Sequence, residues 1–166
     1  SICSTRIQAG SGYPGLQTLF DCSSSDFSGR VPIIADGGIR NSGDIVKALA
    51  AGADFVMLGS LLSGTEETPS DTIEVGGETR KVYRGMASRE AQLAWRGKTS
   101  SLEGVATTVA HKGSVEHTLS DLERGIRSGL SYSGARTIED FQTVAEFVRQ
   151  TRAGTVESGT HIMRVL

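Results

Sequence analysis

Residues 33–39 read Ile-Ile-Ala-Asp-Gly-Gly-Ile, and residues 55–60 read Phe-Val-Met-Leu-Gly-Ser. Each segment is a short apolar run that is typical of a buried strand and that ends in small residues. Between them, residues 41–44 (Asn-Ser-Gly-Asp) predict the start of a helix, and Gly52 predicts its end. Two strands separated by one helix form a βαβ unit. We therefore predict parallel strands at residues 31–35 and 54–58.

Outward from this unit the patterns differ on its two sides. We predict a turn-rich loop at residues 7–14, followed by a helix that carries Leu16, Leu19 and Phe20 on one face. After residue 64, two alternating segments around Gly76–Gly77 predict a β-hairpin with strands at residues 72–75 and 79–83.

The remainder of the chain combines irregular and helical patterns. Residues 87–113 show no clean period and predict a long mobile excursion, which in a compact domain is typical of a flap over a site. Helical spacing returns from Val115 to Leu130 and again from Thr137 to Phe147. We predict no regular element in residues 155–166.

Composition places the chain among water-soluble globular proteins. It has 166 residues, of which 37% are hydrophobic and 22% are charged, and a formal net charge of −2 with both signs interspersed. The sequence has neither the basic patch that would indicate nucleic-acid binding nor an apolar run long enough to span a membrane, and we expect no signal peptide. Cys3 and Cys22 are expected to be thiols, which favours a cytoplasmic location. The 21 glycines fall mostly at the ends of apolar runs, where backbone can touch a ligand.

The number of predicted strands is small for a complete domain. Two parallel strands and one hairpin do not make a stable sheet that is covered on both faces. We therefore expect an α/β fold in which this chain is the C-terminal part of a larger barrel, with the earlier strands outside the chain.

Three loops carry candidate chemistry. Cys3 is followed by Ser4, Thr5 and Arg6, which supply hydroxyls for proton transfer and a cation that favours the thiolate, although a cysteine taken alone is more often a small buried hydrophobe. Asp36 precedes two glycines at a predicted strand end, where parallel barrels bind ligands and where an acidic residue suits a ribose diol. Gly59–Ser60 repeats the device one strand later, so both loops are candidates for binding a phosphate.

The chain resembles the IMP dehydrogenase/GMP reductase family over essentially its whole length. The motifs that carry the resemblance are residues 1–6 (Ser-Ile-Cys-Ser-Thr-Arg), 12–14 (Gly-Tyr-Pro), 34–40 (Ile-Ala-Asp-Gly-Gly-Ile-Arg), 52–60 (Gly-Ala-Asp-Phe-Val-Met-Leu-Gly-Ser), 83–86 (Tyr-Arg-Gly-Met), 103–105 (Glu-Gly-Val), 112–113 (Lys-Gly) and 134–135 (Gly-Ala). The resemblance implies a TIM (β/α)8 barrel. Residues 1–166 would be the C-terminal part of one catalytic domain, with a β-hairpin and flap insertion at about residues 66–113, which we call the flap.

The resemblance also implies roles for individual residues. Cys3 would attack carbon 2 of the purine, and Thr5 with Glu103 would move protons at the leaving group or at water. Asp36 would bind the ribose hydroxyls. The 5′-phosphate and the base would be held by Ser1, Gly37, Gly38, Gly59, Ser60, Tyr83, Gly85, Met86 and Ala87. Simpler readings are a strand aromatic for Tyr83 and a solvated loop charge for Glu103.

The family further implies partners and cofactors. A purine nucleotide monophosphate and a nicotinamide cofactor would bind, and the chains would assemble as homotetramers. A potassium ion would contact the backbone at Cys3, with Glu157, Ser158 and Gly159 contributed by a neighbouring subunit.

Two enzymes of the family share the covalent intermediate but differ in its fate. The dehydrogenase oxidises IMP to XMP with NAD and uses an adjacent Arg-Tyr pair of the flap to activate water. Between Met86 and Glu103 this sequence has no Arg-Tyr pair, and Gly12-Tyr13-Pro14 is similar to the reductase. Residues 37–43 and 58–62 are more similar to the dehydrogenase.

The missing base favours a GMP reductase, which converts GMP to IMP and ammonia with NADPH. IMP dehydrogenase is the alternative. A non-catalytic fragment that binds a purine nucleotide is the second alternative, because residues expected to contact the nicotinamide lie outside this chain.

Overall fold

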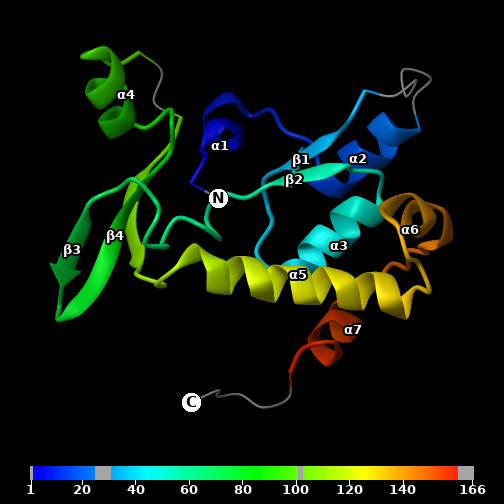
Figure 1. Ribbon diagram of the computed structural model, residues 1–166. Helices are drawn as coiled ribbons and strands as arrows, with labels where there is room; N and C mark the ends of the chain where they lie inside the picture. Colours follow the sequence, from blue (N-terminus) through cyan, green and yellow to red (C-terminus); the bar gives the residue numbers. More distant parts are fainter. Residues whose placement is uncertain (1, 25–30, 101–102, 161–166) are drawn as a thin grey trace.

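A two-stranded parallel sheet forms where the glycine-ended apolar segments predicted it (Figure 1). The computed structural model describes residues 2–24, 31–100 and 103–160. Strand β1 (Ile34–Asp36) pairs with β2 (Phe55–Met57) in the register Ile34↔Phe55 and Asp36↔Met57. Both strands are shorter than expected: β1 begins only after Pro32, which has no N–H to donate, and β2 lacks Asp54 and Leu58.

Helix α3 (Ser42–Ala50) connects the two strands, as the sequence predicted. The Asn41 side chain accepts a hydrogen bond from the Asp44 N–H and so caps the first turn. Ile45 and Leu49 on the inner face are buried with Leu122 and Phe141. This cluster is the main core, and it lies between α3 and the two helices that pack on it, α5 (Val115–Tyr132) and α6 (Ile138–Val144).

Within the described residues the two strands are covered on one side only, although their apolar runs are typical of buried strands. Helix α2 (Gly15–Ser23) contacts β1 and buries Leu19 in a second cluster with Ala48 and Ala53. The other side carries three large apolar side chains that are exposed to 53–60%: Ile34, Phe55 and Met57. The alternation along each strand therefore separates a packed face from an open face.

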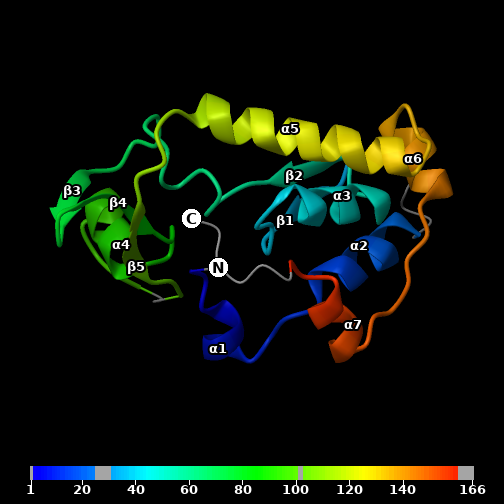
Figure 2. The ribbon, with the colours of Figure 1, turned by 90° about the horizontal axis from the view of Figure 1, so that it is seen from below.

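A second sheet stands to one side of the βαβ unit (Figures 1 and 2). Strands β3 (Thr72–Val75) and β4 (Glu78–Arg84) form the predicted hairpin, in which Gly76 and Gly77 adopt positive φ angles of 62° and 83°. Strand β5 (Ala106–Ala110) pairs with the other edge of β4. We call β3–β4–β5 the flap sheet.

The expectation of an irregular excursion over residues 87–113 is wrong. Besides β5, this stretch contains helix α4 (Arg89–Arg96), which Ser88 caps through a hydrogen bond from the Ala91 N–H. The inner side of α4 buries Ala91 and Gln92 rather than large apolar residues. No apolar period therefore marked the helix in the sequence.

Helix α5 matches its prediction, and α6 ends at Val144 rather than reaching Phe147. The Phe147 ring still packs edge-on against Phe20, with ring centroids 5.0 Å apart. Along α5, Gly125 and Gly129 bring the helix close to α3: a Cβ atom at Gly129 would lie 2.6 Å from a methyl of Val46. The two glycines therefore set the distance between the two helices.

Two short helices were not predicted. Helix α1 (Thr5–Ala9) occupies part of the expected loop, and α7 (Arg152–Glu157) extends into the segment for which no element was predicted. Neither helix buries a residue, so neither has the apolar face by which a helix is recognised in a sequence. Among the helices of the described residues, none is both long enough and apolar enough to cross a membrane.

Gly129→Leu is predicted to lower the stability of the intact protein that contains this chain. The added side chain would overlap Val46 and push α5 away from α3, a change that typically costs about 1–3 kcal/mol. Ser128→Leu is the matched control, since Ser128 is exposed on the same helix. Chemical denaturation measures both. Equal stability of the two variants would show that the Gly129 contact does not limit the packing.

Candidate active site

The two glycine-ended loops lie at the same edge of the parallel sheet. Asp36 is the last residue of β1 and pairs with Met57, the last residue of β2, so the two strands end at the same level of the sheet. Gly37 and Gly38 follow Asp36 with φ angles of 93° and 78°, and no atom lies within 4 Å of a Cβ built on either. Their backbone therefore faces open space in a conformation that favours glycine.

The second loop lies against the flap sheet. A Cβ atom built on Gly59 would lie 3.3 Å from the Tyr83 hydroxyl, so strand β4 brings this phenol to the loop after β2. Ser60 follows, exposed in a turn in which the Leu62 N–H donates to the Gly59 carbonyl over 3.1 Å. The contact brings together three of the predicted nucleotide-binding residues: Gly59, Ser60 and Tyr83.

Cys3, Thr5 and Glu103 form a chain of hydrogen bonds. The Cys3 thiol donates to the Thr5 Oγ1 over 3.2 Å, and the Thr5 hydroxyl donates to the Glu103 Oε2 over 2.6 Å. Thr5 and Glu103 are half-buried, whereas Cys3 is exposed. A nucleophilic atom, a hydroxyl and a carboxylate in hydrogen-bond contact are the groups needed to withdraw a proton from a thiol and return it.

The backbone holds these three residues together. The Val105 N–H donates to the Ile2 carbonyl over 3.1 Å, and Cys3 forms an isolated bridge with Gly104. On its other side the same segment binds the turn after β4, because the Gly85 N–H donates to the Val105 carbonyl over 3.1 Å. The cysteine segment, the Glu103 segment and the turn at Gly85 therefore lie side by side.

Close packing at Gly104 fixes the predicted base-binding residues beside the cysteine segment. A Cβ atom at Gly104 would lie 3.2 Å from the Ser88 backbone nitrogen and 3.6 Å from the Ala87 carbonyl carbon. The Ser88 N–H closes the turn onto the Gly85 carbonyl over 3.0 Å. Met86, within this turn, is 79% exposed.

Two residues that sequence reasoning missed support this turn. Gln92 donates to the Ala87 carbonyl over 2.9 Å and accepts from the Ser100 N–H over 2.7 Å. Ser88 caps α4, and both side chains are buried. A serine followed by Glu90 in the first turn is a helix-start signal, and it was the available clue.

The hydrogen bonds also set the ionisation of the nucleophile. They lower the pKa of the Cys3 thiol below its ordinary value: the Thr5 side chain contributes most, the Thr5 backbone next, and the charge of Arg6 least. Partial desolvation and the Glu103 charge oppose this effect. A thiolate accepts a hydrogen bond where a thiol donates one, so the hydrogen bonds from Thr5 favour the thiolate, which is the nucleophilic form of Cys3.

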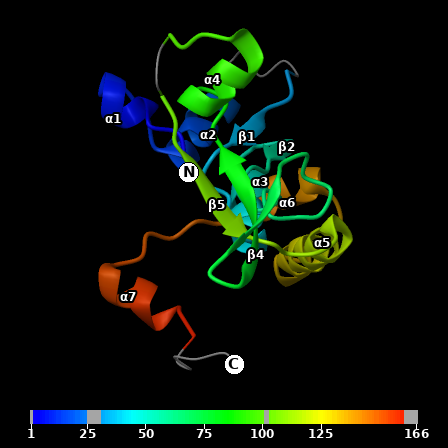
Figure 3. The same cartoon turned by 90° about the vertical axis from the view of Figure 1, so that its left-hand side faces the viewer.

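The remaining predicted residues lie outside this cluster or outside the described residues. Ser1 is not among the residues that the structure describes. Glu157, Ser158 and Gly159 follow at the end of α7, which Figures 1 and 3 place well apart from α1. Within one chain, therefore, these three residues do not join the Cys3 segment. Nowhere in residues 2–24, 31–100 and 103–160 do three or more His, Cys, Asp or Glu side chains cluster to hold a metal ion.

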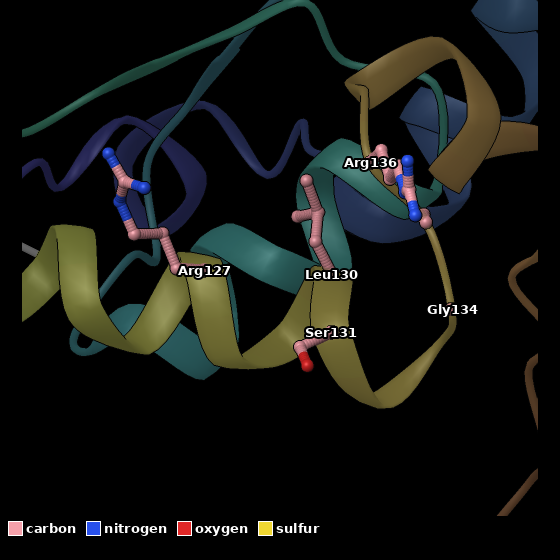
Figure 4. A pocket seen from close by; sticks show the side chains of 6 residues that line it. Arg127, Leu130, Ser131, Gly134 and Arg136 are labelled. Carbon is pink, nitrogen blue, oxygen red and sulfur yellow. The ribbon is translucent and has the colours of Figure 1, made fainter.

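A separate hollow of about 370 Å³ lies at the C-terminal end of α5 (Figure 4). Arg127, Leu130, Gly134 and Arg136 line it, and the Arg127 guanidinium is already paired with Glu123 on the same helix. None of the predicted site residues contributes to this hollow.

Comparisons with known proteins identify the family of this chain. A family model described as IMP dehydrogenase / GMP reductase domain matches residues 1–161. Inosine-5′-monophosphate dehydrogenase of Nitrosopumilus maritimus is 47% identical over 173 residues, and GMP reductase of Leishmania major is 44% identical over 171 residues. Both alignments cover 97% of this chain, but only 36% and 35% of those relatives. The chain thus spans about a third of the length of the curated relatives it matches.

A solved structure is similar over the same range. It is a cysteine-to-alanine variant of GMP reductase from Trypanosoma brucei in complex with guanosine 5′-monophosphate. It is 49% identical to this chain and has a TM-score of 0.91; the match covers 97% of this chain and 34% of the other.

Thr5→Val is predicted to raise the pKa of the Cys3 thiol toward its ordinary value. The valine keeps the shape of the side chain but removes the hydroxyl that contributes most to lowering this pKa. The pH dependence of iodoacetamide alkylation, measured in a Cys22→Ser background, should shift to higher pH. Thr18→Val, on α2, is the control. An unchanged profile in Thr5→Val would show that the hydrogen bond does not stabilise the thiolate.

Proposed function

The chain belongs to the IMP dehydrogenase / GMP reductase family, and we propose that it forms the C-terminal part of the catalytic barrel of a GMP reductase. The proposed reaction is the NADPH-dependent reductive deamination of GMP to IMP and ammonia. The observation that carries the proposal is the series of hydrogen bonds from Cys3 through Thr5 to Glu103. It connects a nucleophilic thiol, through one hydroxyl, to a carboxylate that can accept and return a proton.

The open face of the small parallel sheet supports the barrel. Ile34, Phe55 and Met57 are exposed on the side that no helix of the described residues covers, and a closed barrel would bury side chains of this kind in its interior. Relatives about three times as long as this chain have room for the remaining strands. In the proposed barrel β1 and β2 are late strands, and the loops that follow them lie at the face where such barrels bind their ligands.

The proposed nucleotide lies across the ends of β1 and β2. The backbone at Gly37–Gly38 and Gly59–Ser60, with the Tyr83 hydroxyl and Ser1, binds the 5′-phosphate. The Asp36 carboxylate accepts hydrogen bonds from the ribose hydroxyls. The turn of Gly85, Met86 and Ala87 contacts the purine beside Cys3. The guanosine 5′-monophosphate bound to the similar Trypanosoma brucei enzyme supports a ligand of this class.

Proton transfer along the hydrogen bonds between Cys3, Thr5 and Glu103 accompanies the first half of the reaction. The Cys3 proton passes to Thr5 while the Thr5 proton passes to Glu103, and the thiolate then forms a bond to carbon 2 of GMP. The same protons return in the opposite direction to the exocyclic amino group, which leaves as ammonia. One hydroxyl proton cannot serve both neighbours at once, so Thr5 donates to Glu103 before the transfer and to the Cys3 sulfur after it.

The second half restores the cysteine. NADPH, the second substrate, supplies a hydride to carbon 2, and cleavage of the carbon–sulfur bond releases IMP. The departing thiolate is stabilised by the same Thr5 contact that lowers the pKa of Cys3. The overall reaction consumes one proton in addition to the hydride.

The flap favours the reductase over the dehydrogenase. A dehydrogenase must hydrolyse its intermediate and needs a base for water, which its family members supply as an Arg-Tyr pair. Here Arg96 lies over the Trp95 ring, 4.6 Å from its centroid, and no Arg-Tyr pair occurs between Met86 and Glu103. IMP dehydrogenase remains the second candidate, favoured by the 47% identity to the Nitrosopumilus maritimus enzyme.

The proposed cation site combines different copies of the chain. The Cys3 segment and the end of α7 lie apart in one chain, so the proposed potassium ion would be held by the Cys3 backbone together with Glu157, Ser158 and Gly159 of a neighbouring subunit. Such a site accords with a homotetramer in the cytoplasm, which we propose as the working form of the protein.

The first experiment assays the intact protein that contains this chain with GMP and NADPH and, separately, with IMP and NAD. GMP-dependent NADPH oxidation with stoichiometric ammonia is expected. Cys3→Ala should abolish this turnover and leave GMP binding within a few-fold, because the thiol supplies chemistry and the loops supply binding. Cys22→Ser is the control. Sustained formation of XMP from IMP would contradict the reductase proposal, and turnover by Cys3→Ala would contradict the nucleophile.

Glu103→Gln is predicted to slow ammonia release far more than hydride transfer. The amide cannot take up and return the proton, and loss of a positioned acid–base group typically costs about 10²–10⁴-fold in its step. Ammonia is followed after the enzyme is mixed with GMP alone, and hydride transfer is followed after NADPH is added to enzyme that has already formed the adduct with GMP. Glu67→Gln, which alters a carboxylate elsewhere in the flap, is the control. If both steps slow equally in Glu103→Gln, the carboxylate is not specific to deamination.

A further inference from the structure

Lys112 ties the loop after β2 to the flap sheet. Its Nζ donates to the carbonyls of Ser60 and Leu61 over 3.2 and 2.9 Å. Ser60 follows Gly59 directly, and we call residues 59–61 the phosphate loop, as proposed above. The two carbonyls belong to the turn that begins at Gly59. The Ser63 hydroxyl donates to the Ser60 carbonyl over 3.0 Å from within this turn, and Lys112 binds both carbonyls from the segment after β5.

A hydrogen bond to the Ser60 carbonyl fixes the Leu61 N–H on the opposite side of the same peptide unit. A trans peptide is planar, and its C=O and N–H point in opposite directions, so the Leu61 N–H is held away from Lys112. The Leu62 N–H, opposite the Leu61 carbonyl, already donates to the Gly59 carbonyl within the turn. An anion bound by the loop is recognised by an N–H such as that of Leu61, so the lysine sets its direction without touching the anion.

The lysine is itself held firmly. Its backbone N–H donates to the Gly64 carbonyl over 2.8 Å, and the Glu66 N–H donates to the Gly113 carbonyl over 2.8 Å. A Cβ atom at Gly64 would lie 2.3 Å from the Ala110 carbonyl oxygen, so the backbone at Gly64 is in close contact with the backbone at Ala110. The backbone of Lys112, two residues after β5, is therefore held in place by these contacts.

A second lysine of the flap sheet holds the next part of the same segment. Lys81 is 3% exposed, and its Nζ donates to the carbonyls of Glu66 and Thr68 over 3.0 and 2.6 Å. Lys81 thus stabilises the distant end of the segment, and Lys112 stabilises the end that begins at Gly59.

From this geometry we propose that Lys112 is a positioning residue for the nucleotide phosphate: it orients the backbone of the phosphate loop and thereby sets the preference for a nucleotide over its nucleoside. The proposal rests on the proposed function only in placing the phosphate at residues 59–61. It holds equally for GMP and for IMP, so it does not depend on which of the two reactions the protein catalyses.

Lys112→Met in the intact protein tests the proposal. Three competitors are titrated against a fluorescent GMP analogue in a Cys3→Ala background, which binds GMP without converting it: GMP, ribose 5-phosphate, which lacks the base, and guanosine, which lacks the phosphate. We expect competition by GMP and by ribose 5-phosphate to weaken together in Lys112→Met, by about fivefold, the scale of one net hydrogen bond, and competition by guanosine to stay unchanged. Lys47→Met, at an exposed position of α3, should change none of the three.

Lys112→Arg provides the rescue, because a guanidinium keeps the charge and can donate to two carbonyls. It should recover most of the lost affinity for both phosphorylated competitors, and Lys112→Gln replaces Lys112→Met if the methionine variant does not fold. Equal weakening of all three competitors would assign Lys112 a general structural role, and no weakening of any would remove it from phosphate binding; either result overturns the proposal. A protein that forms XMP instead of IMP would overturn the reductase assignment alone.

Discussion

The hydrogen bond from the Val105 N–H to the Ile2 carbonyl joins two segments from opposite ends of the site. With the bridge between Cys3 and Gly104, it places the cysteine segment beside the Glu103 segment. This backbone pairing brings the Glu103 carboxylate within hydrogen-bond distance of the Thr5 hydroxyl, and thereby links Cys3 to a carboxylate from a distant part of the sequence. The chemistry of the site depends on backbone pairing between residues that are far apart in the sequence.

The flap sheet is a platform as well as a cover. From its strands and their ends come four contributions to the site: the Tyr83 hydroxyl at Gly59, the turn at Gly85, the Glu103 carboxylate and the Lys112 ammonium. A Cβ atom would lie 3.3 Å from the Tyr83 hydroxyl at Gly59 and 3.2 Å from the Ser88 backbone nitrogen at Gly104, so glycine allows the close packing at both positions. The parallel strands thus supply open loops, and the antiparallel sheet supplies the groups that orient them.

The sequence predicted those parts of the fold that carry their own signals. Apolar runs ending in glycine located β1 and β2, and the Asn41 cap located α3. Helix α4 escaped because its buried side consists of Ala91 and Gln92, and α7 escaped because it buries nothing. The burial of β1 and β2 was overestimated, since an apolar run does not tell how much of its cover the same chain provides.

The candidate site divides in the same way. The loops at Asp36 and Gly59 follow from strand ends, which a sequence shows, whereas the contact of Thr5 with Glu103 follows from pairing across the flap, which spacing does not show. The Glu103 role came only from the resemblance to the family. Lys112 stood in a recognised motif but had no role until its carbonyl partners were known.

The most direct measurement is the intact mass of the protein after incubation with GMP in the absence of NADPH and rapid acid quenching. The account predicts a covalent adduct on Cys3 whose mass equals that of GMP less ammonia, and its disappearance when NADPH is added before the quench. Unmodified protein that nevertheless converts GMP to IMP, or an adduct on another residue, would contradict the central role of Cys3.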